Sequence, residues 1–393
     1  MKNYFYTWTD QSKAKHFEFE SAANHILSLK DNKKVYDLSS LSCQASFGHS
    51  CDEIIQSIQK QMVSFSMASP KADFSLKENV TNSLLKLLKL KGKIFYTVSG
   101  AESIENALKM ARDIKQKKII VARQKSYHGA TLGALSVTGD WRNLSHETLD
   151  DWTLRIPEPK DDPDATQAIS LMNKCGVQKI AAICLETVTG GNGVFLADQK
   201  WWDKISSYCN KKQIFLILDE VLCGFYRTGP PFGFQDYNLR PDFVTLSKSI
   251  TGGYIPFGAV YTSLEVAKYY DDHVLSCGLT NYAHPLGLAA LDAILKLTAS
   301  KDFLENLIQR ELEFESMLRA IEKLDSVKEV RYKGLLAAID MHRPPSFDDF
   351  LNNGNYLMVG DKTIILAPAL NYSAEDFKKA LHFFKTTLEN RNG

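Results

Sequence analysis

Two apolar segments of the chain each lead into a residue that could do chemistry. The segment 213–219, QIFLILD, ends in Asp219 and is followed by Glu220, while 242–247, DFVTLS, leads into Lys248. If both segments are parallel strands, their carboxyl ends open on one crevice. A carboxylate there suits a protonated ring nitrogen, and a partly buried lysine is an amine suited to imine formation. Taken singly, the acid could cap a strand end, and the lysine could be an ordinary surface residue.

A third stretch, VSGAESIENALKMAR, has the pattern of a helix start that binds an anion. Ser99 and Glu102 have the S-x-x-E spacing of a capping box. The free N–H groups of the first helical turn attract a negative group, and Gly100 lets a phosphate approach the backbone. Any helix can be capped in this way, so the pattern does not by itself identify an anion-binding site.

A fourth stretch, SYHGATLGALSVTG, follows the apolar segment 117–122 and contains Tyr127 and His128 near its start. An aromatic ring at that point could stack on a planar ligand, or it could only fill a crevice. Pyridoxal phosphate requires the combination of these four features, namely a lysine amine, a carboxylate, an aromatic face and a helix start that binds phosphate.

The chain resembles the class III aminotransferases, the ω-amino-acid transaminase group of pyridoxal-phosphate enzymes of fold type I. The resemblance runs from Trp8 to about residue 375, and its most specific portion is LILDEVLCGFYRTGPPFGFQDYNLRPDFVTLSKSITGGYIPFGAV. It implies an α/β fold with a large domain, built on a mainly parallel seven-stranded sheet, and a smaller α+β domain. It also implies pyridoxal 5'-phosphate as the cofactor.

The resemblance further implies a role for each matching residue. Lys248 would form the Schiff base with the cofactor and then act as acid and base, while Asp219 would keep the ring nitrogen protonated. Val221 and Tyr127 would pack on the two ring faces, and Thr280 would bind phosphate from the neighbouring subunit of a homodimer with shared active sites. The residues expected to bind the cofactor are Ser99, Gly100, Ala101, Tyr127, His128, Glu186, Asp219, Val221, Lys248 and Thr280.

The chain departs from the family pattern at four positions. Thr187 replaces the usual proline after the glutamate, Gly191 stands where an acid is common, and Ser249 replaces a glycine after the lysine. In the stretch ILAPAL, Ala367 stands where relatives that grip an α-carboxylate have an arginine. The amino donor is therefore expected to be an ω-amine, an amine without a carboxylate or a larger metabolite.

The activity expected from these residues is an aminotransferase with a ping-pong mechanism. It would move an amino group from an amine or ω-amino donor to a 2-oxo acid such as pyruvate or 2-oxoglutarate. A decarboxylase, aminomutase or racemase of the same fold would keep the same residues, and ping-pong kinetics with a 2-oxo acid would favour the aminotransferase. A binding module without activity is a third alternative, which the intact set of residues disfavours.

The elements that must position these residues alternate along the chain, as in an α/β protein. Apolar runs predict strands, and amphipathic runs predict helices between them. The expected strands are 93–98, 117–122, 180–186, 213–219, 242–247 and 257–263, and the expected helices include 102–116, 200–213, 301–324 and 374–390. We expect residues 1–45 to pack with the small domain, 46–285 to form the large domain and 286–393 the small domain.

Composition excludes several other classes of protein. The 393 residues carry 47 basic and 46 acidic side chains, which gives no reason to expect nucleic acid or an anionic membrane as a partner. No apolar run reaches membrane-spanning length, the first residues lack the apolar core expected of a signal peptide, and no metal-binding motif is found. The seven cysteines form no CxxC pair, which is typical of a reducing compartment, so we expect a cytoplasmic protein without a metal.

Overall fold

The computed structural model describes residues 3–14, 16–30 and 32–390. Its largest sheet has seven strands in the order β4-β10-β9-β8-β7-β5-β6. The pairs are parallel except those of β10, which runs antiparallel to both β4 and β9. The bounds are β4 Gly92–Thr97, β5 Ile119–Arg123, β6 Thr153–Ile156, β7 Ile180–Glu186, β8 Phe215–Asp219, β9 Phe243–Leu246 and β10 Gly258–Ser263. The mainly parallel seven-stranded sheet expected from the sequence is thus confirmed.

The strands β7 and β8 lie in the middle of this sheet, and every one of their residues is buried. Side chains alternate between the two faces of a strand. On β8, Leu216 and Leu218 therefore join the cluster that contains Trp201 of α7, while Phe215 and Ile217 join the cluster on the other face. A strand covered on both faces reads as a continuous apolar run, which is why QIFLILD shows no polar alternation.

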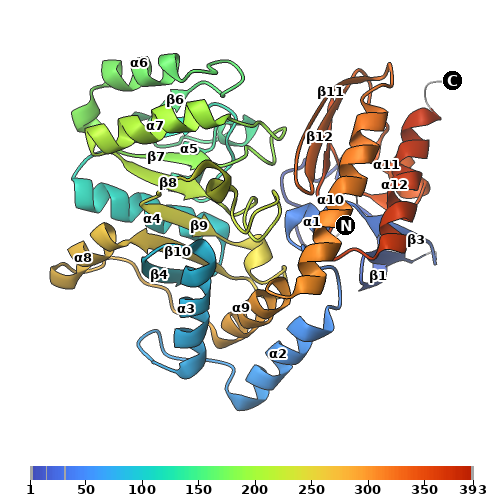
Figure 1. Cartoon of the computed structure of the whole chain (residues 1–393), viewed down its shortest axis with the longest axis horizontal. Helices are drawn as coiled ribbons and strands as arrows, with labels where there is room; N and C mark the ends of the chain where they lie inside the picture. Colours follow the sequence, from blue (N-terminus) through green and yellow to red (C-terminus); the bar gives the residue numbers. More distant parts are fainter. Residues whose placement is uncertain (1–2, 15, 31, 391–393) are drawn as a thin grey trace.

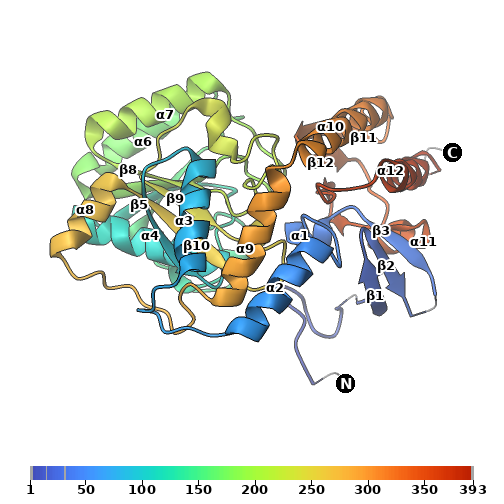
Figure 2. The same ribbon diagram turned by 60° about the horizontal axis from the view of Figure 1, so that its bottom comes forward.

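Helices cover both faces of the sheet (Figure 1). One cluster of buried side chains includes residues of α6 and α7, and the other includes residues of α4. The helices of this lobe are α2 Asp52–Ser64, α3 Ser75–Leu88, α4 Gly100–Lys115, α5 Leu132–Val137, α6 Thr166–Cys175, α7 Gln199–Lys212, α8 Leu264–Asp272 and α9 Pro285–Thr298. The helix α9 packs against α2 and α3, along the side of the lobe that Figure 2 brings forward.

A second, smaller lobe contains two further sheets. One has the order β11-β12-β15-β14, and the other, β1-β2-β3-β13, joins the N-terminal strands to residues 355–356 through a parallel pairing. The elements are β1 Phe19–Ala23, β2 Ile26–Leu29, β3 Lys34–Asp37, α10 Lys301–Ile321, β11 Val327–Lys333, β12 Leu336–Met341, α11 Phe347–Asn352, β13 Asn355–Tyr356, β14 Met358–Val359, β15 Thr363–Leu366 and α12 Ala374–Glu389. The division of the chain into 1–45, 46–285 and 286–393 stays a prediction.

A short left-handed turn connects the N-terminal strands to the large lobe. The four residues of α1 Ser40–Cys43 all have positive φ, between 44° and 66°. Residues other than glycine reach this region at a cost, so the surroundings must hold the turn. The carboxylate of Asp37 accepts hydrogen bonds from the backbone N–H of Ser39 and Leu41, and the Ser40 hydroxyl donates to the Ala367 carbonyl at 2.7 Å.

No helix in the described part of the chain is both long enough and apolar enough to cross a membrane.

Candidate active site

A cavity of about 320 Å³ opens at the carboxyl ends of β7, β8 and β9. Eight of the ten residues predicted to bind the cofactor line it, while Ser99 and Thr280 do not. The lining residues are Gly100, Ala101, Tyr127, His128, Gly129, Ala130, Glu186, Gly191, Asp219, Val221, Leu222, Ser247 and Lys248. Segments separated by more than a hundred residues in the sequence therefore meet at one point.

Asp219, the last residue of β8, is held by three donors. Its Oδ2 lies 2.7 Å from Nδ1 of His128. Its Oδ1 accepts from the Val221 N–H at 3.0 Å and from the Thr245 hydroxyl at 3.2 Å. A carboxylate oxygen can accept two hydrogen bonds, so Oδ2 retains one acceptor position. The carboxylate is buried, oriented and able to accept one more proton donor.

Thr245 is a site residue that the sequence analysis missed. It lies on β9 directly opposite Asp219 in the parallel register of β8 and β9. Its hydroxyl is completely buried, and a buried hydroxyl needs a partner. Aligning the two predicted strands in parallel register would have placed this threonine beside the aspartate.

Lys248 stands where β9 ends, at the start of a 3₁₀ turn, Lys248–Ile250. Its φ of 48° lies in the left-handed region, which is sparsely populated by residues with a side chain. The Ser247 hydroxyl donates to the Phe257 carbonyl at 2.9 Å, and the Thr251 hydroxyl donates to the Ile255 carbonyl at 2.6 Å, which fixes the turn on both sides. Within the described chain, the Lys248 amine makes no hydrogen bond and no ion pair, so it is available to a ligand in the cavity.

The start of α4 forms a second wall of the cavity. The Ser99 hydroxyl accepts from the Glu102 N–H at 3.2 Å, and the Glu102 carboxylate accepts from the Val98 N–H at 2.9 Å. This confirms the predicted capping by Ser99, whose hydroxyl is occupied by the helix itself. Gly100 faces the cavity, and a Cβ there would lie 3.0 Å from Cγ1 of Val221.

Glu186, at the end of β7, lies beside Asp219 in the register of β7 and β8. Its two oxygens accept from the N–H of Tyr127 and the N–H of Gly190, each at 3.0 Å. Burial raises the pKa of Glu186 to about 7, and the charge of Asp219 adds to this effect. The carboxylate thus joins the two loops that frame the cavity.

Glu220, the residue after Asp219, does not line the cavity. It accepts from the N–H groups of Gly233 and Phe234, each at 2.9 Å, and from the Thr187 hydroxyl. Burial raises the pKa of Glu220 to about 7, against the effect of these donors. The threonine that replaces the family proline therefore has a structural partner.

Ala367, one of the four departures from the family pattern, is not among the residues that line the cavity. Ala367 is fully buried in a cluster with Cys43, Leu222 and Ile365. Its backbone N–H donates to the Leu38 carbonyl at 2.8 Å. The buried alanine offers no charged group at this position, and the expectation about the amino donor stays a prediction.

The other two departures have different surroundings. Ser249 is buried, and its hydroxyl lies 2.6 Å from that of Ser46, which also accepts from Arg227 at 3.1 Å. Gly191 lines the cavity and has no heavy atom within 4 Å of a Cβ built there. A side chain at Gly191 would therefore project into open space at the mouth.

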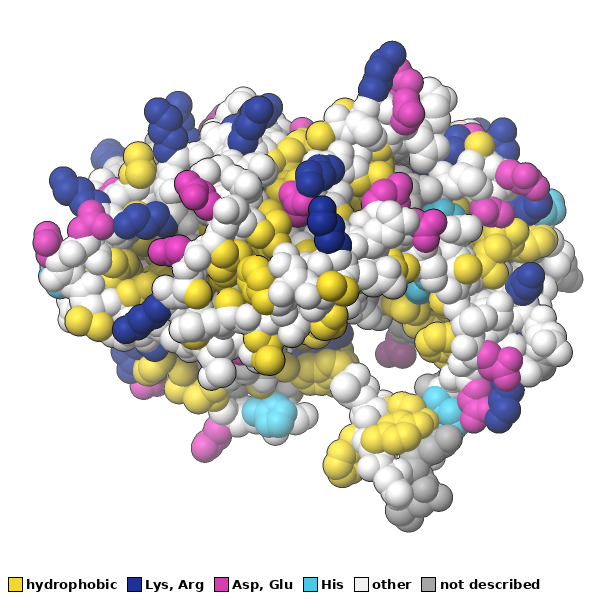
Figure 3. All heavy atoms as spheres, turned by 90° about the horizontal axis from the view of Figure 1, so that it is seen from below, with side chains coloured by type: hydrophobic (Ala, Val, Ile, Leu, Met, Phe, Trp, Pro, Cys, Tyr) yellow, Lys and Arg dark blue, Asp and Glu magenta, His cyan; other side chains and the backbone are white. Residues whose placement is uncertain are grey.

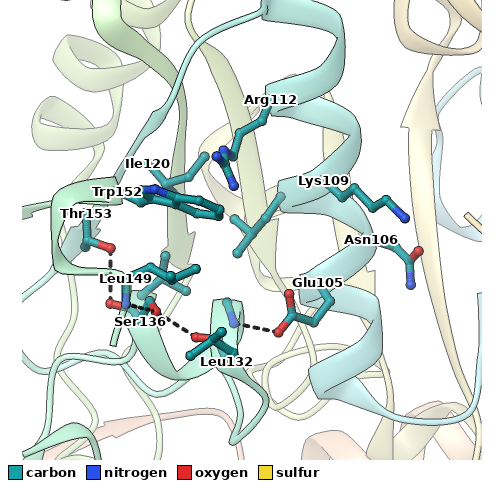
Figure 4. A pocket seen from close by; sticks show the side chains of 13 residues that line it. Glu105, Asn106, Lys109, Arg112, Ile120, Leu132, Ser136, Leu149, Trp152 and Thr153 are labelled. Carbon is teal, nitrogen blue, oxygen red and sulfur yellow. Dashed lines mark hydrogen bonds between the residues drawn. The ribbon is translucent and has the colours of Figure 1, made fainter. Parts of the chain in front are cut away.

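A larger cavity, about 630 Å³, lies between α4 and α5 (Figure 4). Arg112 and Trp152 face each other in it, with the guanidinium carbon 3.3 Å from the ring centroid. None of the ten predicted residues lines it. Volume alone does not locate the chemistry, since the smaller cavity holds the lysine and the carboxylates.

Thr280 is exposed and lies outside the cavity, on the segment between α8 and α9. Among the residues that the structure describes, no group of three or more His, Cys, Asp or Glu side chains could hold a metal ion.

The sequence model of the family described as "Aminotransferase class-III" matches residues 8–388. The chain is a class III aminotransferase. An acetylornithine aminotransferase from Bacillus cereus is 30% identical to it over 92% of each chain. A gamma aminobutyrate transaminase, mitochondrial, from Solanum lycopersicum is 26% identical over 94% of this chain and 80% of that protein.

A solved structure extends this assignment to fold and cofactor. The taurine:2-oxoglutarate aminotransferase from Bifidobacterium kashiwanohense, in complex with PLP and glutamate, aligns with a TM-score of 0.92 and 28% identity over 99% of this chain and 95% of that one. This class III aminotransferase therefore has fold type I, uses pyridoxal phosphate and catalyses transamination.

Proposed function

We propose that this enzyme transfers an amino group from an amine or ω-amino donor to a 2-oxo acid, such as pyruvate or 2-oxoglutarate, by a ping-pong mechanism. One observation carries the proposal. The unpartnered amine of Lys248 and the anchored carboxylate of Asp219 line the same cavity of about 320 Å³. Such a pair suits a cofactor with an aldehyde and a basic ring nitrogen.

The residues of the cavity fit pyridoxal phosphate. When bound, this cofactor supplies an electron sink for the reacting carbon. Oδ2 of Asp219 has the acceptor position that a protonated ring nitrogen needs, and His128 holds that carboxylate in place. Tyr127 and Val221 would cover the two ring faces, and the backbone N–H groups of Gly100 and Ala101 would bind the phosphate.

Lys248 would have two tasks in this scheme. Its amine would hold the cofactor through the aldehyde group, and during the transfer Nζ would accept and return a proton of the substrate. The left-handed turn fixes the start of the lysine side chain, while the long side chain can still follow the substrate. No other lining residue combines an uncommitted basic group with this reach.

The names of the relatives support an ω-amino donor. They mention acetylornithine, gamma aminobutyrate and taurine. Each of these compounds carries an amine at one end and an acid group towards the other. A donor of this type presents its amine to Lys248 and leaves the acid group towards the mouth of the cavity.

The proposal includes a homodimer in which Thr280 of one subunit contacts the phosphate of the other. Its exposure supports a partner-facing role. Figure 3 views the side of the molecule on which α2 and α9 lie and shows hydrophobic side chains in patches there. Exposed apolar side chains include Met62, Val63 and Met67, which follow one another closely at the end of α2. Their burial would favour association.

Mixing two inactive variants tests the shared site. Lys248→Ala and Thr280→Asp each disable their own homodimer. In a mixed dimer, one site receives the wild-type lysine from one subunit and the wild-type threonine from the other. Unfolding and refolding the two variants together should therefore restore activity, whereas mixtures that stay inactive would show that Thr280 does not act across the interface.

Initial-rate kinetics test the activity itself. With varied donor and pyruvate, parallel lines in a double-reciprocal plot are expected for ping-pong transfer. Release of carbon dioxide, or turnover without an acceptor, would show that the enzyme catalyses another reaction of the same fold instead of transamination.

A cytoplasmic location is also part of the proposal. It is supported by the seven cysteines, none of which forms a disulfide.

A further inference from the structure

An arginine lies among three aromatic rings beside the cavity. Arg142 belongs to a 3₁₀ turn, Trp141–Asn143, and its guanidinium carbon lies 4.6 Å from the ring centroid of Tyr127. The corresponding distances are 5.0 Å to Trp141 and 5.5 Å to Trp8. Aromatic faces attract a cation and leave the edge of the guanidinium for hydrogen bonds.

The hydrogen-bonding capacity of Arg142 is only partly used. One terminal nitrogen pairs with Asp140, whose other oxygen accepts from the Arg142 backbone N–H at 2.8 Å. Nε of Arg142 is buried and has no hydrogen-bond partner among the described residues. A guanidinium has five donors, so Asp140 orients this one and leaves donors for a second anion.

Arg142 is not itself a lining residue of the active-site cavity, but two contacts place it next to residues that are. Tyr127, on which the guanidinium lies, lines the cavity. Asp140 also accepts from the side-chain amide of Asn192 at 3.0 Å, and the neighbouring Gly191 lines the cavity as well. Arg142 is therefore tied to both loops that frame the opening.

The wall of the cavity offers no other cation for a substrate anion. Its only basic side chains are those of Lys248 and His128, and His128 is bonded to Asp219. The nearby Arg227 is 1% exposed and donates to the carbonyls of Leu335 and Pro368. Because Ala367 stands in place of the family arginine, a cation at the mouth of the cavity would have to bind the acid group of such a donor.

The N-terminal loop covers this arginine. Trp8 has a φ of 56°, and the side chain of Gln11 holds the loop by bonding both the N–H and the carbonyl of Tyr6, at 2.9 and 2.8 Å. Further along, Phe17 packs against Tyr356 of the smaller lobe. Trp8 thus covers one side of the Arg142 guanidinium, and the side chain stays 23% exposed. A partly desolvated cation attracts an anion more strongly than a fully hydrated one does.

We propose that Arg142 binds the acid group of the amino donor, and that the enzyme selects linear amino acids whose carboxylate or sulfonate lies at the end opposite the reacting amine. This inference rests on the transaminase function proposed above. A guanidinium fork binds the oxygens of either acid group through charge-assisted hydrogen bonds. Asp140, which shares the cation, would moderate the affinity and so permit product release.

The test compares donors of matched size in wild type and Arg142→Gln. The donors are 3-aminopropanoate, 2-aminoethanesulfonate and n-propylamine, with pyruvate as the acceptor. The ratio of kcat/KM for each acid donor to that for n-propylamine should fall ~10–100-fold in the variant, as expected for the loss of a hydrogen bond to a charged group. Most of the fall should be in KM, and Arg142→Lys should restore part of it. The control, Arg319→Gln, removes an exposed arginine and should leave the ratio unchanged.

A second variant keeps the test decisive if Arg142→Gln does not fold. Asp140→Asn leaves the arginine in place and removes its competing charge, so the same ratio should rise. Ratios that neither variant moves would overturn the inference while the transaminase function stands. Failure of the wild-type enzyme to convert any of the three donors would instead contradict the proposed function, and the inference would fall with it.

Discussion

At the scale of single residues, the carboxylate of Asp219 is oriented before any ligand arrives. His128, Thr245 and the Val221 N–H fix both of its oxygens, so little reorganisation would accompany the proposed binding of a ring nitrogen. Lys248 differs from Asp219, because its backbone is held in a turn while its side-chain amine makes no hydrogen bond among the described residues. An oriented carboxylate suits a residue that holds the cofactor, and an uncommitted amine suits a residue that transfers a proton.

Replacing Asp219 with Asn tests the holding task. The amide keeps the shape but cannot supply the charge that keeps a ring nitrogen protonated, so kcat/KM should fall by ~10²–10³-fold or more. Thr245→Val serves as the control, because it removes one donor and keeps the charge, and its loss should be much smaller. An Asp219→Asn enzyme within tenfold of wild type would contradict this role.

The titration of Glu186 should appear in the pH dependence of stability. Its folded-state pKa is raised from 4.5 to about 7, so the folded protein holds the proton to higher pH than the unfolded chain does. Its contribution is present below pH 4.5 and is lost as the pH rises to about 7. Between these limits, the free energy of unfolding should fall more in wild type than in Glu186→Gln, by on the order of 2–3 kcal/mol. Denaturant titrations from pH 5 to 8 measure this difference, and equal slopes would contradict it.

The residues predicted from the sequence are those that end a strand. Asp219 and Lys248 could be found because each follows an apolar run, and parallel strands bring their carboxyl ends together. Thr245 and Arg142 could not be found in the same way. The contacts of Thr245 depend on strand register, and those of Arg142 depend on a loop that meets the N-terminal segment.

At the scale of elements, the start of α4 combines a cap with an open first turn. Ser99 satisfies one N–H of the helix, and Gly100 leaves the remaining N–H groups open to the cavity. The capping pattern and the helix were both predictable, because the signals are local in sequence.

Two other elements could not be predicted in this way. The left-handed turn Ser40–Cys43 contains no glycine, and its conformation depends on partners that are distant in the sequence. The short strand β6, TLRI, was missed because only its last residue is fully buried.

A methyl group at Gly100 should interfere with the cofactor more than with the fold. The new Cβ would lie 3.0 Å from Val221 and face the cavity, while alanine is a better helix former than glycine. We expect Gly100→Ala to raise the Kd for pyridoxal phosphate ~10-fold or more and to leave the thermal midpoint of the cofactor-free protein unchanged or higher. Gly278→Ala is the matched control, because nothing lies within 4 Å of its added Cβ. Equal affinities for the cofactor in the two variants, measured by fluorescence titration, would count against this placement of the phosphate.

At the scale of the whole molecule, Arg227 joins three distant segments. It donates to the carbonyls of Leu335 and Pro368 in the C-terminal lobe, and to the hydroxyl of Ser46 near the N-terminal strands. Burial lowers the pKa of Arg227 to about 10, so the guanidinium is still charged at neutral pH. This side chain helps to set the position of one lobe against the other, and the cavity lies near that boundary.

Removing this arginine should destabilise the whole molecule. Arg227→Met keeps much of the volume and leaves buried acceptors without a donor, which should lower the free energy of unfolding by about 3 kcal/mol. Arg343→Met, at an exposed arginine, should change it little. Thermal unfolding of both variants measures the difference, and similar midpoints would show that Arg227 does not join the lobes.

In the function proposed above, Lys248 and Asp219 serve a cofactor that carries an amino group between two substrates. The most direct test follows the absorbance of the purified enzyme with pyridoxal phosphate through a full cycle. A band near ~410–430 nm should decline on addition of an amino donor while a band near ~330 nm grows, and pyruvate should then restore the first band. The Lys248→Ala enzyme should not complete this cycle. A band that no donor converts, or one that Lys248→Ala cycles as wild type does, would contradict the account.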